Sequence, residues 1–262
     1  MALSLSNVIR KTSDKPPIIV IYGRGKMGKT TLASEFPDAI FVQTEDGAGD
    51  IEVSSFKDEP LTTYNEVHEA LSALATEDHE FKTLIVDSIT QLEPIIWQET
   101  CRRNNWDSIE APGYGKGYIE ADVVWRDFLS ACTWLRDRKN MTVILIAHET
   151  VETFSDPERE DYSRYKMRLH KRAEAMIRER ADVVGFMNMA VTLDKGKSGK
   201  DAAKAKGSGQ RQLNLAPRPT FEAGNRYSMP EKILINNGQG YAALAPHLPG
   251  HRETKTTAAE AA

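Results

Sequence analysis

The feature that most constrains this chain is a glycine-rich, basic turn that follows an apolar run near its start. The run PPIIVIYG is continuous, largely β-branched and stopped by glycine, which is typical of a strand buried on both faces of a parallel sheet. The next residues, GRGKMGKT at 23–30, match the spacing G-x-x-x-x-G-K-[ST] and lead into a helix start. This succession predicts an α/β fold with a phosphate-binding loop after its first strand.

The residue types in this loop suit a nucleoside triphosphate. Backbone N–H groups of a glycine-rich turn can surround phosphate oxygens, and the following helix start adds positive potential. We expect Lys29 to reach the β- and γ-phosphates and the Thr30 hydroxyl to bind Mg²⁺. The alternative, a turn with an incidental lysine, leaves the flanking strand and helix unexplained. The residues expected at the nucleotide are Gly23, Arg24, Gly25, Lys26, Met27, Gly28, Lys29, Thr30 and Thr31.

Three later runs, AIFVQTE, KTLIVDS and MTVILIAH, repeat the pattern of a buried strand with a polar end. Ligands of parallel α/β sheets bind at the carboxyl ends of the strands, so these ends predict one shared site. Asp87 ends its run as the carboxylate of a Walker B strand does, and we expect it to hold Mg²⁺. Its alternative role is that of a turn former or helix N-cap.

Two further strand ends supply candidates for the chemistry of hydrolysis. Glu45 and Asp46 are both candidates for the base that orients or deprotonates water, and the position of Glu45 favours it. The alternative is a solvated acidic turn. His148 is a candidate sensor of the γ-phosphate, whereas a lone histidine after a strand can also be a structural hydrogen-bonding group.

Helices and a hairpin are expected around these strands. The stretch TYNEVHEALSAL begins with a capping box at Thr63 and Glu66 and continues with helical apolar spacing. A basic helix is expected over 168–181, followed by two strands that form a hairpin with a Gly/Lys-rich tip. One more helix is expected where four apolar side chains share a face, at Val124, Phe128, Cys132 and Leu135.

Length and charge limit the organisation more than the function. A length of 262 residues predicts one main domain. A net charge of −4 gives no indication of a polyanion partner. We expect an ATPase-type domain over 1–248, with a core at 16–193, a β-rich extension at 194–248 and a disordered tail at 249–262. The basic stretch 195–211 is the place where a local polyanion site would lie.

Cysteine usage and hydropathy indicate a soluble protein in a reducing, cytoplasmic setting. Cys101 and Cys132 lack the spacing of a metal or redox site. The start of the chain has no signal-peptide core, and no run approaches the ~20 apolar residues of a membrane span. No membrane partner is therefore expected.

The motifs GRGKMGKT, QTEDG, LIVDS and LIAHE, in this order, resemble a RecA-type ATPase core. The chain is most similar to small phage-encoded RecA-like ATP-binding proteins linked to single-strand annealing and recombination. Further motifs of those proteins recur here, among them TYNEVHEAL, DSITQLE, GYGKGY, RADVVGFM and AGNRYSMP. The resemblance implies a mainly parallel sheet flanked by helices, in which the strand of His148 lies between the P-loop and Walker B strands.

The resemblance also implies site residues and partners. Glu45 stands where such enzymes keep the glutamate that activates water, and His148 where several keep a glutamine. Arg226 is expected to complete the nucleotide site of a neighbouring subunit in a ring or filament. Single-stranded DNA is the implied ligand, with a single-strand binding protein or phage nuclease as candidate partners in the host cytoplasm. The implied DNA-facing segments are 110–118, with Tyr114, Lys116 and Tyr118, and 149–168 with its flank, with Arg164, Lys166, Arg168, Lys171 and Arg172.

Three functions compete at this point. The leading hypothesis is a Mg²⁺-dependent, DNA-stimulated ATPase for phage recombination, annealing or repair. A hexameric helicase-type motor shares the same core but usually carries an extra domain. A small-molecule P-loop kinase leaves the TEDG and AH strand ends unexplained.

Overall fold

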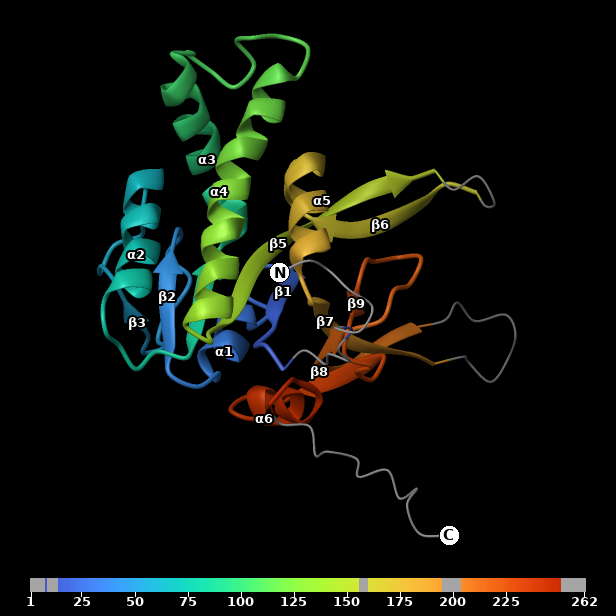
Figure 1. Ribbon diagram of the computed structural model, residues 1–262. Coiled ribbons are helices and arrows are strands. Elements are labelled where there is room, and N and C mark those ends of the chain that lie inside the picture. Colours follow the sequence, from blue (N-terminus) through green and yellow to red (C-terminus); the bar gives the residue numbers. More distant parts are fainter. Residues whose placement is uncertain (1–7, 9–13, 156–159, 195–203, 251–262) are drawn as a thin grey trace.

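The computed structural model describes residues 8, 14–155, 160–194 and 204–250 (Figure 1). Its centre is a sheet in the order β10-β8-β7-β1-β5-β4-β2-β3, with β6 joined to β5 and β9 to β7. The strands from β7 to β3 run parallel. Their bounds are β1 Ile18–Gly23, β2 Ala39–Gln43, β3 Ser54–Ser55, β4 Thr83–Asp87, β5 Thr142–Phe154 and β7 Val183–Asp194.

This strand order confirms the predicted α/β fold and brings four strand ends to one edge. Strand β5 lies between β1 and β4, as expected for a RecA-like core. Gly23 pairs with His148, and Asp87 pairs with both Ile146 and Gln43. The phosphate-binding loop and the ends of β2, β4 and β5 therefore share the carboxyl edge of the sheet.

Helices cover both faces of the sheet because alternate side chains of each strand point to opposite sides. Ile18, Val20 and Tyr22 of β1 belong to a core formed with α2 Tyr64–Thr76, α3 Ile89–Asn104, α4 Lys116–Arg138 and α5 Lys171–Arg180. Ile19 and Ile21 belong to the core of the other face, formed with α1 Lys29–Ser34 and α6 Gly240–Leu244. A short 3₁₀ helix, Ala245–His247, follows α6.

Most of the helix predictions are confirmed. The capping box of α2 forms, with Glu66 N–H donating to Thr63 Oγ1 and Thr63 N–H donating to Glu66 Oε2. The four apolar side chains assigned to one face of α4 are all buried. Helix α3 was not predicted, because Pro94 interrupts a pattern that otherwise reads as helical.

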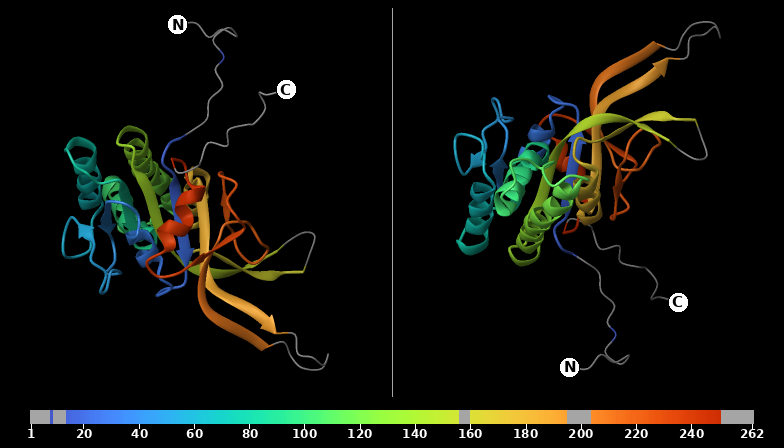
Figure 2. Two further views of the ribbon diagram at one scale, coloured as in Figure 1. Left: turned by 90° about the horizontal axis from the view of Figure 1, so that it is seen from below. Right: turned by 90° about the horizontal axis from the view of Figure 1, so that it is seen from above.

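Two hairpins extend from the body of the molecule, as Figure 2 shows. The first lies in the segment 149–168 that the resemblance implies to face DNA, where the extended β5 pairs antiparallel with β6 Tyr162–Met167. Side chains alternate between exposed and half-buried along β6, and the half-buried ones are polar, so the strand lacks the apolar alternation that would predict it. The second, formed by β7 and β8 Lys204–Asn214, confirms the predicted hairpin.

The described residues from Lys204 onward continue the same sheet. Strand β8 runs antiparallel to β7, and β10 Lys232–Ile235 runs antiparallel to β8. Strand β9 Gly224–Asn225 pairs with the start of β7. Of the basic stretch 195–211 and the tail 249–262, which was expected to be disordered, residues 195–203 and 251–262 lie outside the described residues.

Both cysteines are free, and Cys132 is buried. In the part of the chain that the structure describes, every helix is too short or too polar to cross a bilayer.

Candidate nucleotide-binding site

The loop between β1 and α1 is built around close backbone approaches and one buried lysine. A Cβ added at Gly23 would overlap the carbonyl oxygen of Met187 on β7, so only glycine fits there. Lys29 is 5% exposed, and its Nζ donates to the carbonyl oxygens of Gly23 and Arg24, both at 3.0 Å. Burial lowers the pKa of Lys29, while the nearby carboxylates of Asp87 and Glu45 oppose this shift.

Asp87 and Thr30 form a hydrogen-bonded pair beside this lysine. Thr30 Oγ1 donates to Asp87 Oδ2 at 2.7 Å, and Asp87 is 2% exposed. Burial raises the pKa of Asp87, and the bond from Thr30 offsets part of that rise. Two oxygens of this kind suit Mg²⁺, which usually takes one or two protein ligands together with substrate phosphates. Among the described residues, no cluster of three His, Cys, Asp or Glu side chains offers a metal site of its own.

Glu45 and His148 form the second polar pair of this edge. His148 Nε2 lies 2.8 Å from Glu45 Oε1 and 3.1 Å from Oε2. Burial alone would raise the pKa of Glu45, but the contact with His148, a hydrogen bond from Ser88 and the charge of Lys29 together hold this pKa below its usual value. An ionised carboxylate in this position can accept a proton from water.

Neighbouring hydrogen bonds fix this pair relative to Asp87. Thr44 Oγ1 donates to the carbonyl oxygen of Ser88 at 2.7 Å and accepts from the Ser88 N–H at 3.0 Å. The backbone N–H of His148 donates to Thr90 Oγ1 at 2.9 Å. The ends of β2, β4 and β5 are therefore joined across the site, although they come from distant parts of the chain.

Asp46, the other candidate base, lies apart from this pair. Its side chain is exposed and has no polar contact with any described residue of the phosphate-binding loop.

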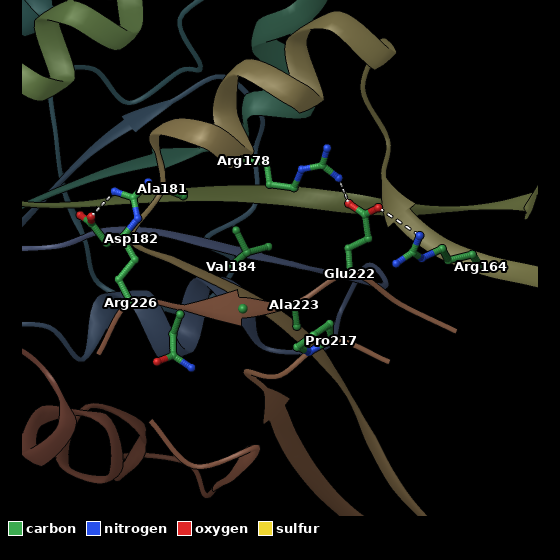
Figure 3. Close-up of a pocket in the computed structure, with 11 residues that line it drawn as sticks. Arg164, Arg178, Ala181, Asp182, Val184, Pro217, Glu222, Ala223 and Arg226 are labelled. Carbon is green, nitrogen blue, oxygen red and sulfur yellow. Dashed lines mark hydrogen bonds and ion pairs between the residues drawn. The ribbon is translucent and has the colours of Figure 1, made fainter. Parts of the chain in front are cut away.

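Arg226 lies at the opposite end of the sheet from the P-loop of its own chain. Its Nη1 donates to Asp182 Oδ1 at 2.9 Å, and Asp182 in turn accepts from the N–H of Ile18, at the start of β1. It lines a pocket of about 390 Å³ (Figure 3). In this pocket Arg164 and Arg178 both contact Glu222. The structure therefore does not bring Arg226 together with the other expected site residues.

Two site residues were not assigned to the nucleotide from the sequence. Burial raises the pKa of Glu149, with the charges of Lys29 and Arg24 opposing the rise, which places this carboxylate beside the P-loop. The position of Glu149 directly after His148 is the sequence feature that could have predicted this placement. Arg211 on β8 packs against Gly28, and no local pattern could predict a contact across that distance in sequence.

The segment 110–118 offers fewer free side chains than expected. Tyr114 is fully exposed and Lys116 is exposed at the start of α4. Tyr118 is not free to stack on a base, which corrects the prediction: its ring stacks on His170 at a centroid distance of 4.2 Å, and its hydroxyl donates to Glu110.

The basic residues of the second segment divide into two groups. Arg168 and Lys171 are exposed, and among the described residues neither side chain has a carboxylate partner. The others are held by carboxylates: Arg164 by Glu222, Lys166 by Glu174 and Glu152, and Arg172 by Asp122.

Comparisons with known proteins place this site in a family. No curated protein matches the chain. The crystal structure of the RadB recombinase is similar, with a TM-score of 0.46 and 16% sequence identity, over 86% of this chain and 90% of that one. The model of the AAA domain family matches residues 15–227, which include the P-loop, Asp87, Glu45 and His148. The chain therefore belongs to the AAA domain family.

Proposed function

We propose that this protein hydrolyses ATP at the carboxyl edge of its sheet and couples that reaction to single-stranded DNA during phage recombination, annealing or repair. The observation that carries the proposal is the meeting of a buried P-loop lysine with two polar pairs, Thr30 with Asp87 and Glu45 with His148. Phosphoryl transfer needs little covalent chemistry from a protein, so positioning and charge at such an edge account for most of the catalysis.

Each group has a role in the proposed reaction. The backbone of residues 23–31 and Lys29 bind the phosphates, and the amine leaves its two carbonyl partners for phosphate oxygens. Thr30 and Asp87 would hold Mg²⁺, which supplies positive charge to the phosphates when bound. Glu45 accepts a proton from the attacking water, while His148 orients the carboxylate and responds to the γ-phosphate.

The path to DNA begins at His148. This residue stands at the base of the β5–β6 hairpin, and its carbonyl oxygen accepts from the N–H of Arg168 at 2.8 Å. Among the described basic residues of this segment and its flank, Arg168 and Lys171 are the ones without a carboxylate partner, so we assign them to DNA phosphates. Tyr114 and Lys116, on the turn before α4, add a stacking ring and a further cation.

The protein is proposed to act as an oligomer whose subunits each consist of one ATPase domain over 1–248. Arg226 supports this proposal because its side chain remains 58% exposed although it contacts Asp182. An arginine that reaches a neighbouring nucleotide can bind two oxygens of the γ-phosphate. A single-strand binding protein or nuclease would join this assembly on DNA.

The test is the ATPase rate with and without single-stranded DNA. We expect stimulation by DNA in the wild type and none in the double variant Arg168→Ala/Lys171→Ala. The variant should also lose about 1.4 from the slope of log affinity against log salt, since each single-strand phosphate contact contributes about 0.7. The matched control is Lys57→Ala, which removes an exposed lysine that is paired with Glu66.

Two outcomes would contradict the proposal. An ATP hydrolysis rate that single-stranded DNA does not change, together with phosphate transfer to a small acceptor, would indicate a kinase. Separation of duplex strands driven by ATP would indicate a helicase-type motor instead of an annealing or accessory ATPase.

A further inference from the structure

A cation from the C-terminal strands lies directly on the phosphate-binding loop. A Cβ added at Gly28 would overlap Nη1 of Arg211 and would lie 3.0 Å from its Cζ. Gly28 immediately precedes Lys29 and has a φ of 90°, in the region that favours glycine. The guanidinium of a residue on β8 therefore packs against the backbone that precedes the P-loop lysine.

Neighbouring elements hold this guanidinium in place. Arg211 pairs with Ile235 of β10, and its Nη1 donates to Asn237 Oδ1 at 2.8 Å. The turn after Asn237 is fastened to α1, because the carboxylate of Glu35 accepts three backbone N–H bonds from it. These come from Gly238 at 2.8 Å, Gly240 at 2.5 Å and Tyr241 at 3.0 Å. The position of Arg211 is thus set by the helix that follows the P-loop.

The described part of the chain does not neutralise the charge of Arg211. Within the described ranges of the chain, no carboxylate lies within ion-pair distance of its guanidinium, and its one side-chain partner is an uncharged amide. A half-buried arginine is costly to leave without an anion, and arginine is well suited to bidentate contacts with phosphate. The arrangement calls for an anion at the P-loop.

We propose that Arg211 contacts a phosphate of the bound nucleotide in cis, so that the C-terminal strands complete the nucleotide site of their own subunit. The inference rests on the proposed function, because it takes ATP as the anion. It differs from the role of Arg226, which acts on a neighbouring subunit, and it gives the residues after 194 a part in nucleotide binding.

The test compares Arg211→Ala, Arg211→Lys and the wild type by titration of fluorescently labelled ATP with Mg²⁺. We expect Arg211→Ala to bind about tenfold more weakly, the effect of losing one charge-assisted hydrogen bond, and Arg211→Lys to be intermediate. Asn237→Ala should weaken binding less, because it only frees the guanidinium. The control is Arg218→Ala, which removes an exposed arginine whose partner is Glu231.

Thermal unfolding without nucleotide separates a phosphate contact from a structural one. Equal melting temperatures of Arg211→Ala and wild type, with the weaker binding, would support the contact. Unchanged ATP affinity of Arg211→Ala would overturn the proposed contact, whether or not the melting temperature falls. If the wild type binds no ATP, the proposed function fails together with this inference. If the wild type binds ATP and Arg211→Ala binds it equally tightly, only the inference about Arg211 fails.

Discussion

The pocket lined by Arg226 and the P-loop edge of the sheet both carry clustered charge, but they use it differently. In the pocket, Arg164 and Arg178 share the carboxylate of Glu222, and Arg226 contacts Asp182 (Figure 3). At the P-loop edge, Lys29 donates to backbone carbonyls and Arg211 to an amide. The partners of a cation, more than its presence, distinguish a region that stabilises the fold from a region suited to an external anion.

The energetic reason is the cost of desolvation. An arginine that is 16% exposed, as Arg164 is, needs an anion in the folded protein, and Glu222 supplies it at 3.3 Å. At the P-loop edge, Lys29 and Arg211 need an anion in the same way, but their hydrogen bonds go to uncharged oxygens. A nucleotide then gains the interaction energy that the fold has left unused.

The strongest way to test the comparison is to remove the P-loop cation. We expect Lys29→Ala to lower ATP hydrolysis at least about a thousandfold, because a direct phosphate partner is lost. The melting temperature should be nearly unchanged, since the amine bonds only to two carbonyl oxygens. Steady-state ATPase and thermal unfolding measure the two effects, with Lys57→Ala as the surface control. Turnover close to the wild-type rate would contradict the assignment of the P-loop.

Removal of the proposed base should have the next largest effect. Glu45→Gln keeps the shape of the side chain but cannot accept a proton, so turnover should fall several hundredfold while ATP binding stays within about twofold. Asp46→Asn is the matched control, because its side chain is exposed and lies apart from His148. If Asp46→Asn is slow and Glu45→Gln is not, the choice between the two carboxylates is wrong.

Arg226 is the cation that could break the comparison, since it is partnered by Asp182 and yet proposed to act on a neighbour. Arg226→Ala alone should lose about a hundredfold in ATPase rate. Mixed with Lys29→Ala in equal amounts, it should recover about a quarter of the wild-type rate, because that share of random interfaces pairs an intact P-loop with an intact arginine. Mixtures that co-assemble without recovery would leave Arg226 as a structural residue.

A buried carboxylate extends the comparison to acids. Glu93 is 6% exposed, and among the described residues it accepts only the N–H of His170, at 3.0 Å to each oxygen, and contacts no cation. Burial raises its pKa to about 7, against a smaller lowering by that N–H. The folded state therefore keeps a proton that the unfolded chain loses above about pH 4.5, and stability falls as pH rises from there to about 7.

Glu93→Gln should remove this dependence because the amide oxygen still accepts from His170 and carries no charge. We expect the variant to gain about 2 kcal/mol in free energy of unfolding over the wild type at pH 8, with little difference near pH 4.5. Urea unfolding across this range measures it. A difference that does not change with pH would show that Glu93 titrates normally.

The local parts of this structure could be predicted from the sequence. The P-loop is one strand, one turn and one helix in succession, and the ends of β2, β4 and β5 carry a polar residue after an apolar run. Parallel pairing brings those ends together once the strand order is known. For this reason Glu45 and His148 were expected near the P-loop, and the structure brings them to it.

The features that depend on distant partners could not be predicted. Helix α3 holds Pro94 within its first turns, and β6 shows polar alternation because its half-buried Arg164 and Lys166 form ion pairs. The contact of Arg211 with Gly28 joins residues far apart in the chain, and the stacking of Tyr118 on His170 does the same. Each of these features follows from tertiary packing, which local sequence propensity does not predict.

The central place of β1 also governs how the chain can fold during synthesis. Strand β1 is made first but pairs on its two sides with β5, which begins at Thr142, and with β7, which begins at Val183. At about 5–20 residues per second, an apolar strand waits roughly ten to thirty seconds for its second partner to be translated.

Both edges of β1 are open to other chains until β5 has been translated, and one edge stays open until β7 follows. Proteins dominated by such distant pairings fold slowly and expose aggregation-prone strands on the way. A chain that terminates before β7 would keep one edge of β1 unpaired permanently. We therefore expect truncations within residues 150–180 to be insoluble even though they contain the P-loop and the strand ends β2, β4 and β5.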